Sequence, residues 1–412
     1  MRSTSANGWD HTTRSPNALR IESLNRRRSL DPATLPSANV GSQAACLSRK
    51  AGPGMEHNTI FIRCLRIFVG SGDTRHGLLH PRLANRQGQP LAAKPRMGTL
   101  IGVDEAGYGP NLGPLVVMAT RWNVPDLPDR VDLFERLAGC VTREKRRDDT
   151  RVWIADSKSV YNPSRGLADL ERGVLSLWSL RTGVDRPANL GELWRSLDPT
   201  RFADRDDQPW YAGDGPALPL VGTAPSVEVV ERFRRGCAEA GVALETVQGR
   251  IVCPARFNQE VARTGTKGRM LSETTLDLVA ELIGDRFDEP TLVLLDKHGG
   301  RNQYREFLLP WIDGRLPVCL EEGAERSRYR VDRVEFRFQA KSEAHFPVAA
   351  ASMFAKYVRE LTMEPFNRWW RERVPDLAPT AGYPVDAKRF WSEIEAVAAR
   401  EGFPRTLLWR DR

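Results

Sequence analysis

The stretch Gly102–Val117, GVDEAGYGPNLGPLVV, combines two adjacent acids with a glycine-rich turn and apolar residues on both sides. Apolar residues predict a buried strand over Thr99–Val103 and another over Leu115–Trp122, with a tight connection between them. Asp104 and Glu105 therefore lie where a strand ends. Adjacent acids repel each other unless a cation or proton lies between them, so the stretch indicates a hard-metal site. A surface turn that carries two acids is the plainer interpretation.

A third acid follows a second strand. The apolar run Thr291–Leu295 predicts a central strand, and Asp296 comes directly after it. Ligands gather at the carboxyl ends of strands in open α/β sheets. Asp296 is therefore a candidate partner for Asp104 and Glu105.

An alanine-rich helix is predicted over Ala349–Glu360. Ser352, Lys356 and Glu360 follow one another at helical spacing and project from the same side. An ordinary Lys–Glu pair would explain two of them. The small residues on the opposite face favour close packing against the sheet, which would turn the polar side towards a site.

From Gly98 onward, strand-like and helix-like segments alternate, which predicts an α/β fold. Further helices are expected at Val131–Ala138, Ser226–Ala240, Leu271–Phe287 and Ala387–Arg400, and further strands at Val152–Ala155, Val242–Val252 and within Tyr329–Phe338. Residues 161–225 show weak periodicity and are interpreted as an insertion or an irregular lobe. The aromatic side chains of that insertion could stack on bases, but such residues more often anchor a small core; they are Trp178, Trp194, Trp210 and Tyr211.

Net charge is unevenly distributed along the 412 residues, which together carry +8. Residues 1–97 hold 15 Lys/Arg against 5 Asp/Glu, whereas residues 98–412 hold 46 against 48. The basic excess therefore gives no information about the partners of the main domain. We interpret residues 1–97 as a disordered basic extension. An organelle transit peptide, a start codon assigned too early, and a basic arm that grips phosphate are the alternatives.

The six cysteines show neither CxxC spacing nor a histidine at zinc-ligand distance, which favours a reducing compartment. The best apolar run, Thr59–Val69, is short and interrupted by Arg63 and Arg66, so no membrane span is predicted. We therefore expect a cytoplasmic protein, and a monomer.

Five motifs, VDEAGYGPNLGP, DSKSV, LVLLD, AAASMFAKYVRE and AGYPVD, occur in this order. In register they resemble the motifs of the type 2 ribonucleases H, ribonuclease HII, and most of all its archaeal and eukaryotic branch. The resemblance covers the chain from Thr99 to Trp409 apart from the insertion. It implies an RNase H-like fold over residues 98–412, with a mixed central sheet flanked by helices and a C-terminal helical extension.

The resemblance also implies an activity. Such enzymes cut the RNA strand of RNA–DNA hybrids, or a duplex that contains ribonucleotides, with two Mg²⁺ or Mn²⁺ ions. The catalytic, metal-binding acids carried over by position are Asp104, Glu105, Asp296 and Glu360. Two cations activate the attacking water and stabilise the leaving 3′ oxygen, and carboxylates balance and hold their charge.

Substrate contacts follow from the same motifs. The main chain of the turn Gly107, Tyr108 and Gly109 would meet the ribose 2′-OH. The remaining residues fall into three roles: Lys158 and Lys356 would hold phosphates, Ser157 and Ser352 would donate hydrogen bonds, and Tyr383 would stack near the RNA–DNA junction.

Two positions and one segment depart from the motifs of the family. Tyr108 stands where the family has Arg or Lys, which bears on the preference for a single embedded ribonucleotide. Glu360 replaces Asp, and its extra methylene favours Mn²⁺ over Mg²⁺. The basic segment Lys297–Arg301 is either a phosphate contact or a plain surface loop. Two other functions therefore stay open: a nuclease of the same fold that acts on another structured nucleic acid, and a catalytically silent nucleic-acid-binding relative, which the four acids disfavour.

Overall fold

The computed structural model describes residues 97–222 and 224–411. Seven strands form one mixed sheet in the order β5-β2-β1-β6-β9-β8-β7. They are β1 (Gly98–Ala106), β2 (Leu115–Val124), β5 (Ala243–Val252), β6 (Thr291–Asp296), β7 (Val318–Glu322), β8 (Arg326–Val331) and β9 (Val334–Gln339). Strands β1, β6 and β9 run parallel to one another, and the other neighbours pair antiparallel. A separate parallel pair joins β3 (Val141–Thr142) to β4 (Val152–Trp153). The interpretation of residues 1–97 falls, apart from Met97, outside the described residues.

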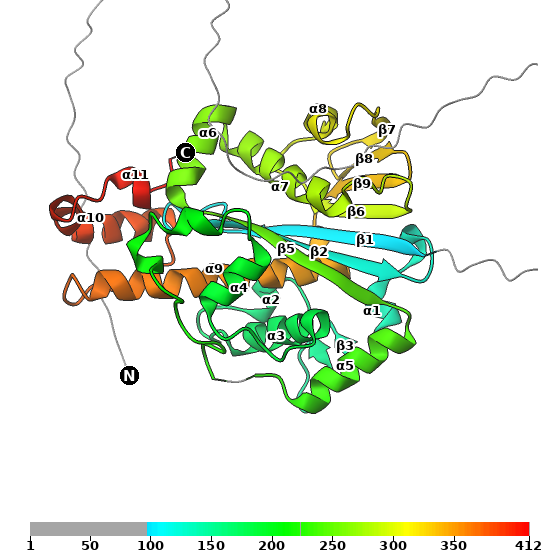
Figure 1. Ribbon diagram of the computed structural model, residues 1–412, viewed down its shortest axis with the longest axis horizontal. Coiled ribbons are helices and arrows are strands. Elements are labelled where there is room, and N and C mark those ends of the chain that lie inside the picture. The colour runs from blue at the N-terminus through cyan, green and yellow to red at the C-terminus, as the bar shows by residue number, and fades with distance from the viewer. Residues whose placement is uncertain (1–96, 223, 412) are drawn as a thin grey trace, which may run out of the picture. The chain divides into compact units, whose positions relative to one another are not determined.

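Helices cover both faces of the sheet (Figure 1). On one face lie α6 (Pro254–Thr264), α7 (Lys267–Ile283) and α8 (Arg305–Leu308). The other face carries α1 (Leu133–Arg136), α2 (Ser157–Val160), α3 (Ala168–Thr182), α4 (Leu190–Leu197), α5 (Val227–Glu239) and α9 (Phe346–Arg371). Short 3₁₀ turns complete the secondary structure: η1 (Pro128–Arg130), η2 (Phe202–Arg205), η3 (Pro209–Tyr211), η4 (Leu309–Trp311) and η5 (Ser342–Ala344). The predicted mixed sheet flanked by helices is confirmed.

Strand β1 lies inside the sheet, between β2 and β6, and contributes to two cores. Successive side chains of a strand point to opposite faces. Leu100 accordingly joins the core beneath α9, while Ile101 and Val103 join the core beneath α7. Every residue from Gly98 to Val103 is buried, which explains the continuous apolar run in the sequence.

Helix α9 approaches β1 very closely, as its alanine-rich face predicts. A Cβ atom at Gly102 would lie 2.2 Å from the carbonyl carbon of Pro347 in the first turn of α9. Thr120 on the neighbouring strand donates a hydrogen bond of 2.8 Å to the Pro347 carbonyl. The absence of a side chain at Gly102 therefore lets the helix lie directly on the two strands that carry the acidic turn.

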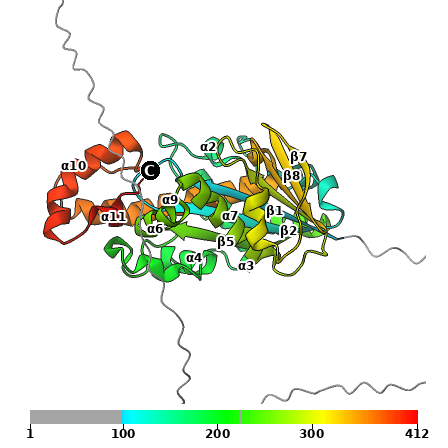
Figure 2. The ribbon, with the colours of Figure 1, turned by 90° about the horizontal axis from the view of Figure 1, so that it is seen from above.

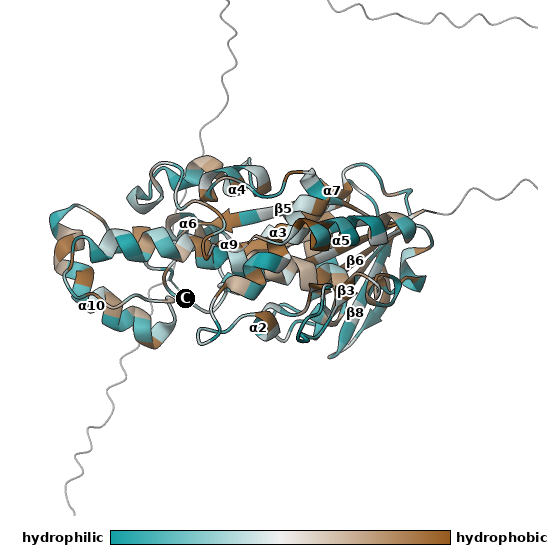
Figure 3. Ribbon diagram, turned by 90° about the horizontal axis from the view of Figure 1, so that it is seen from below, coloured by the Kyte–Doolittle hydropathy of each residue, from teal (hydrophilic) through white to brown (hydrophobic). Residues whose placement is uncertain are grey.

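The interpretation of residues 161–225 as irregular is wrong for much of the segment, because α3 and α4 are regular helices. Helix α3 is buried on most sides, from Leu170 to Ser179, so its sequence lacks the one-sided apolar stripe of a surface helix. Figure 3 shows α3 beside α5 and α9, whereas α5 presents a hydrophilic outer side. The three tryptophans and Tyr211 of the segment are buried in the core beneath α9. This agrees with the interpretation that they anchor a core.

The C-terminal helical extension consists of α10 (Pro384–Arg400) and α11 (Arg405–Leu408). Figure 2 shows both beside the C-terminal part of α9, at the opposite end from β7 and β8. Phe390 of α10 stacks on Phe366 of α9 with ring centroids 5.5 Å apart. Within the part of the chain that the structure describes, no helix is long and apolar enough to cross a bilayer.

Candidate active site

The first three predicted acids emerge together at one edge of the sheet. Val103 of β1 pairs with Leu295 of β6 in parallel register. Asp104 and Asp296 follow these residues directly, so the two acids leave neighbouring strands at the same level, and Glu105 follows Asp104. The structure thus places Asp104, Glu105 and Asp296 as the sequence predicts, at the carboxyl ends of central parallel strands.

The environment of these acids disfavours their charge. Burial raises the pKa of Asp104, and a hydrogen bond from Ser352 offsets part of that effect. Burial also raises the pKa of Glu105, and the charges of Asp104 and Asp296 raise it further. Acids that repel one another in a site with little solvent are stabilised by a cation. Perturbed carboxylates of this kind gather at functional sites.

Asp296 carries an unsatisfied oxygen. Its Oδ1 atom is buried and has no hydrogen-bond partner. Burial raises the pKa of Asp296, and main-chain hydrogen bonds from Ser342, Lys297 and Lys341 partly offset the shift. Ser342 also donates a hydrogen bond of 2.7 Å to the Leu295 carbonyl. The strand end is therefore held in place while one carboxylate oxygen is left without a partner, which suits a metal ligand.

Lys158, in the short helix α2, is exposed and is the common neighbour of several acids. The charge of Asp156 raises its pKa most, and the charges of Asp104, Glu343 and Asp296 also raise it. Sequence reasoning missed Asp156 and Glu343. Asp156 could have been noticed because it directly precedes the predicted Ser157–Lys158 segment. Glu343, in η5, gives no local signal.

Glu360 is engaged elsewhere in this structure. Its Oε1 atom lies 2.5 Å from Lys356 Nζ, and its Oε2 atom accepts a hydrogen bond of 2.9 Å from the Tyr161 hydroxyl. It is not among the groups that most strongly shift the pKa of Asp104, Glu105 or Asp296. The ordinary Lys–Glu helix pair is therefore present, and the role of Glu360 as a metal ligand stays a prediction.

The two predicted serines meet beside Asp104. The hydroxyls of Ser157 and Ser352 share a hydrogen bond of 2.9 Å, although 195 positions separate them in the chain. The Ser157 main-chain N–H also donates to the Ser352 hydroxyl at 3.4 Å. Helix α2 is thereby joined to α9 next to the acid that Ser352 contacts.

Tyr108 and Tyr383 line the rim of the acidic group. Lys267, in the first turn of α7, lies with Nζ 4.2 Å from the centre of the Tyr108 ring. Tyr383 is 53% exposed, and a Cβ atom added at Gly109 would lie 3.9 Å from its ring. Lys267 of α7 thus places a positive charge against the Tyr108 ring. The exposed ring of Tyr383 lies beside the turn that contains Gly109.

The basic segment after Asp296 is a loop in which Gly299 and Gly300 are exposed while two of its side chains bind neighbouring elements. A phosphate contact by this segment stays a prediction. Lys297 Nζ donates hydrogen bonds to Asn302 at 2.7 Å and to the main-chain carbonyls of Gly323 and Ala324. His298 is buried, with Nδ1 2.9 Å from the Ser272 hydroxyl. Lys297 and His298 therefore fasten the loop to neighbouring elements.

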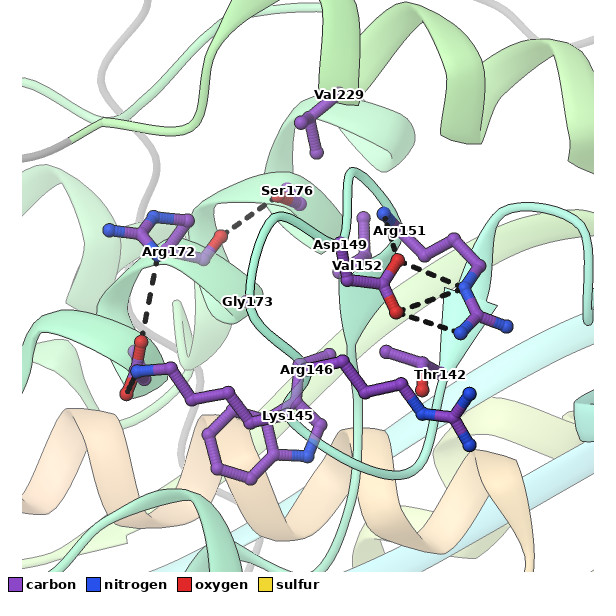
Figure 4. A pocket seen from close by; sticks show the side chains of 12 residues that line it. Thr142, Lys145, Arg146, Asp149, Arg151, Val152, Arg172, Gly173, Ser176 and Val229 are labelled. Carbon is purple, nitrogen blue, oxygen red and sulfur yellow. Dashed lines mark hydrogen bonds and ion pairs between the residues drawn. The ribbon is translucent and has the colours of Figure 1, made fainter.

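A pocket of about 110 Å³ lies between the β3–β4 loop, α3 and α5 (Figure 4). Its charged side chains pair among themselves: Arg151 binds Asp149 at 2.7 Å, and Lys145 binds Asp169 at 2.5 Å. None of the four predicted acids lines it. This pocket is therefore not the site that the sequence predicts.

The donor set fits a hard divalent cation, because carboxylates are the ligands such cations prefer and one oxygen of Asp296 lacks a partner. Over residues 97–222 and 224–411, no three acidic, histidine or cysteine side chains are grouped closely enough to hold a metal ion. A cation would therefore have to draw the acids closer together than they lie in this structure.

Fold and site define an α/β protein with acids gathered at the ends of two parallel central strands. No family model and no curated protein matches the sequence. Solved structures of ribonucleases HII and HIII are similar. A chain of the PCNA–ribonuclease HII complex from Archaeoglobus fulgidus has 16% sequence identity and a TM-score of 0.35, and the match covers 76% of this chain and 94% of that one.

Two further structures give similar values. The ribonuclease H2 of Pyrococcus horikoshii has 15% identity and a TM-score of 0.30 over 75% of this chain and 92% of its own. Bst-RNase HIII in complex with Mn²⁺ has 17% identity and a TM-score of 0.34 over 76% of this chain and 66% of its own. We base its function on the residues of the site.

Proposed function

We propose that this protein is a metal-dependent endonuclease that hydrolyses the RNA strand of RNA–DNA hybrids. One observation carries the proposal: Asp104, Glu105 and Asp296 leave adjacent parallel strands at one level, in surroundings that raise the pKa of all three. The order of the five sequence motifs supports the same activity.

Asp104, Glu105 and Asp296 would hold Mg²⁺ or Mn²⁺. When bound, two such cations activate a water molecule and stabilise the leaving 3′ oxygen. The acids contribute by keeping their carboxylates on rigid strand ends, where a cation would draw them together. Neither a cysteine nor a serine has to act as a nucleophile.

The fourth acid is a choice between two side chains. Glu360 occupies the position of the fourth acid in the motif, although Lys356 and Tyr161 bind it here. Glu343 is the alternative, because its charge acts on Lys158 together with the charges of Asp104 and Asp296. Neither is among the groups that most strongly shift the pKa of Asp104, Glu105 or Asp296. We therefore keep Glu360 as the proposed fourth metal ligand, which would have to leave Lys356 and Tyr161 in order to bind a cation.

The remaining predicted residues have substrate roles. Ser352 lowers the pKa of Asp104 through its hydrogen bond and so offsets part of the effect of burial. Lys158 is exposed beside the acids and would neutralise a phosphate, as would Lys356. Tyr383 offers an exposed ring for stacking next to the turn of Gly107, Tyr108 and Gly109.

A second candidate is a nuclease of another structured nucleic acid, which Tyr108 favours because it places an aromatic ring where the motif has a cation. Cleavage assays on three labelled substrates separate the candidates: an RNA–DNA hybrid, a DNA duplex with one ribonucleotide, and a branched DNA. We expect cleavage of the hybrid with Mn²⁺ or Mg²⁺ and none with a chelator. Cleavage of the branched DNA alone would favour the second candidate, and binding without cleavage would identify a silent relative.

A further inference from the structure

The turn after β1 is held by a buried arginine from the C-terminal end of the chain. Arg410 is 1% exposed, and its Nη2 atom donates a hydrogen bond of 2.6 Å to the Gly107 carbonyl. The same atom also donates to the Pro110 carbonyl. One guanidinium group thus binds two carbonyls of the turn that begins two residues after Glu105.

A second buried arginine, Arg359 of α9, holds the rest of the turn. Its Nη1 atom donates to the Pro114 carbonyl at 2.5 Å, and its Nη2 atom donates to the Leu112 carbonyl at 3.0 Å. Nη2 also reaches the Ala381 carbonyl at 3.0 Å. Because Ala381 lies two residues before Tyr383, Arg359 connects the turn to the segment that carries the exposed ring.

The main chain of the C-terminal segment follows the same turn. Arg410 N–H donates to the Asn111 carbonyl at 2.8 Å, and the Asn111 side chain donates to the Arg410 carbonyl at 3.1 Å. Leu112 and Trp409 form an antiparallel bridge. The position of Arg410 is therefore set by its backbone as well as by its side chain.

These guanidinium groups lack the usual counter-charge. Among the residues that the structure describes, neither Arg359 nor Arg410 forms an ion pair, and Nε and Nη1 of Arg410 are buried without a hydrogen-bond partner. Burial, together with the charge of Arg359, lowers the pKa of Arg410. The compensation for Arg410 comes from carbonyls and from the Phe257 ring, whose centre lies 4.8 Å from Arg410 Cζ. Burying a charge that no acid balances costs stability. A requirement of stability alone would favour a neutral donor or an acid beside the arginine.

The turn itself is shaped around Arg359. Gly107 has φ of +87°, and a Cβ atom there would lie 2.8 Å from both Arg359 Cδ and the Pro114 carbonyl oxygen. The chain can therefore pass between the acids and the arginine only with glycine at this position.

We propose that Arg410, acting with Arg359, is a positioning residue of the nuclease site, which fixes the turn Gly107–Pro110 at a set distance from Asp104 and Glu105. The inference rests on the proposed function. Arg410 does not touch the reacting atoms. It orients main-chain groups of the turn that the substrate meets, and a displacement of about 1 Å in such a group can cost on the order of 100-fold in rate.

The test compares three variants at a temperature well below their unfolding midpoints. Arg410→Lys keeps the charge but loses the planar guanidinium whose Nη2 atom donates to the Gly107 and Pro110 carbonyls, and Arg410→Met removes the charge as well as these hydrogen bonds. Arg405→Met is the matched control, because Arg405 is an exposed basic residue of the same segment that stacks on Trp409 at 4.5 Å. Cleavage rate, hybrid affinity without metal, and the unfolding midpoint are measured for each.

We expect Arg410→Lys and Arg410→Met to lower kcat by roughly tenfold or more while hybrid affinity changes less than about threefold, with the control unchanged. A folded Arg410→Lys with the kcat of the wild type would overturn the inference and leave the proposed function standing. Variants that are unfolded at the assay temperature would also overturn it, because Arg410 would then act in folding alone. A wild-type protein that leaves the hybrid intact would overturn both.

Discussion

Val103 in β1 and Leu295 in β6 are partners in parallel register, and each is followed directly by an aspartate. The pairing of the two strands therefore places Asp104 and Asp296 at the same edge of the sheet, and loop conformation does not contribute to this placement. Rigid placement of this kind is what a metal-dependent site needs, because ligand geometry is then set by the backbone.

Asp104→Asn should abolish cleavage, with a loss on the order of 100-fold or more, because a ligand charge is removed. It should leave hybrid affinity within a few fold. Metal-free Asp104→Asn should also unfold at a higher temperature than metal-free wild type, because burial raises the pKa of Asp104 and makes its charge costly. The control is Asp169→Asn, in α3, whose carboxylate pairs with Lys145. Equal cleavage by Asp104→Asn and wild type would remove Asp104 from the site.

Glu343→Gln and Glu360→Gln separate the two candidates for the fourth acid. We expect a loss on the order of 100-fold for Glu360→Gln and roughly tenfold or less for Glu343→Gln. Glu360 occupies the position of the fourth acid in the motif, whereas Glu343 is related to the site only through its effect on the pKa of Lys158. Mn²⁺ titration of cleavage gives the comparison. The reverse order of losses would move the assignment to Glu343.

Ser352→Ala should move the acidic limb of the pH–rate profile to higher pH. The hydrogen bond from Ser352 lowers the pKa of Asp104 against the effect of burial. Without it the pKa rises further, so a higher pH is needed to ionise the carboxylate. The dependence of kcat/KM on pH measures this shift. Ser176→Ala, in α3, serves as the control, and an unmoved limb in Ser352→Ala would show that the hydroxyl does not tune Asp104.

Glu335 should stabilise the fold in a pH-dependent way. Burial opposes its charge, but hydrogen bonds from Arg328 and Arg337 hold the pKa of Glu335 below its ordinary value of 4.5. Its contribution, about 1 kcal/mol, is therefore present above pH 4.5 and is lost as the pH falls through the lower folded-state pKa. Urea unfolding of Glu335→Gln and wild type should differ near neutral pH and converge in acid. The exposed acid Glu395 provides the control variant, and a difference that persists in acid would contradict the assignment.

Trp210→Ala should lower the free energy of unfolding by about 3 to 5 kcal/mol. Trp210 is 4% exposed and packs edge-to-face on Phe366 at 5.3 Å and on Trp369 at 5.8 Å. Chemical denaturation measures the loss. If instead stability were unchanged and hybrid affinity fell, the ring would be stacking on bases, as the other interpretation of the sequence holds.

Local patterns were enough to predict the centre of the fold and most of the acids. Composition alone predicts where two strands end. These strand ends follow the apolar runs Thr99–Val103 and Thr291–Leu295, and a glycine-rich turn comes after the first. The helical spacing of Ser352, Lys356 and Glu360 predicts that they lie on one side of α9. In each case, the neighbours that decide the structure lie within a few residues in the sequence.

Features that depend on tertiary contacts could not be predicted. Helix α3 is buried on most sides, which removes the periodicity that would reveal it. Glu343 becomes significant only because β9 and η5 bring it to Lys158. The contact of Arg410 with Gly107 joins residues 303 positions apart. Such pairs leave no signal in a single sequence.

The central claim is that Asp104, Glu105 and Asp296 support cleavage of RNA in a hybrid. The most direct test is to label both strands of an RNA–DNA hybrid and to identify the ends produced with Mn²⁺. We predict that the RNA strand is cut to give 3′-hydroxyl and 5′-phosphate ends, that the DNA strand stays intact, and that a chelator stops the reaction. An uncut RNA strand, or cleavage that continues in the chelator, would contradict the claim.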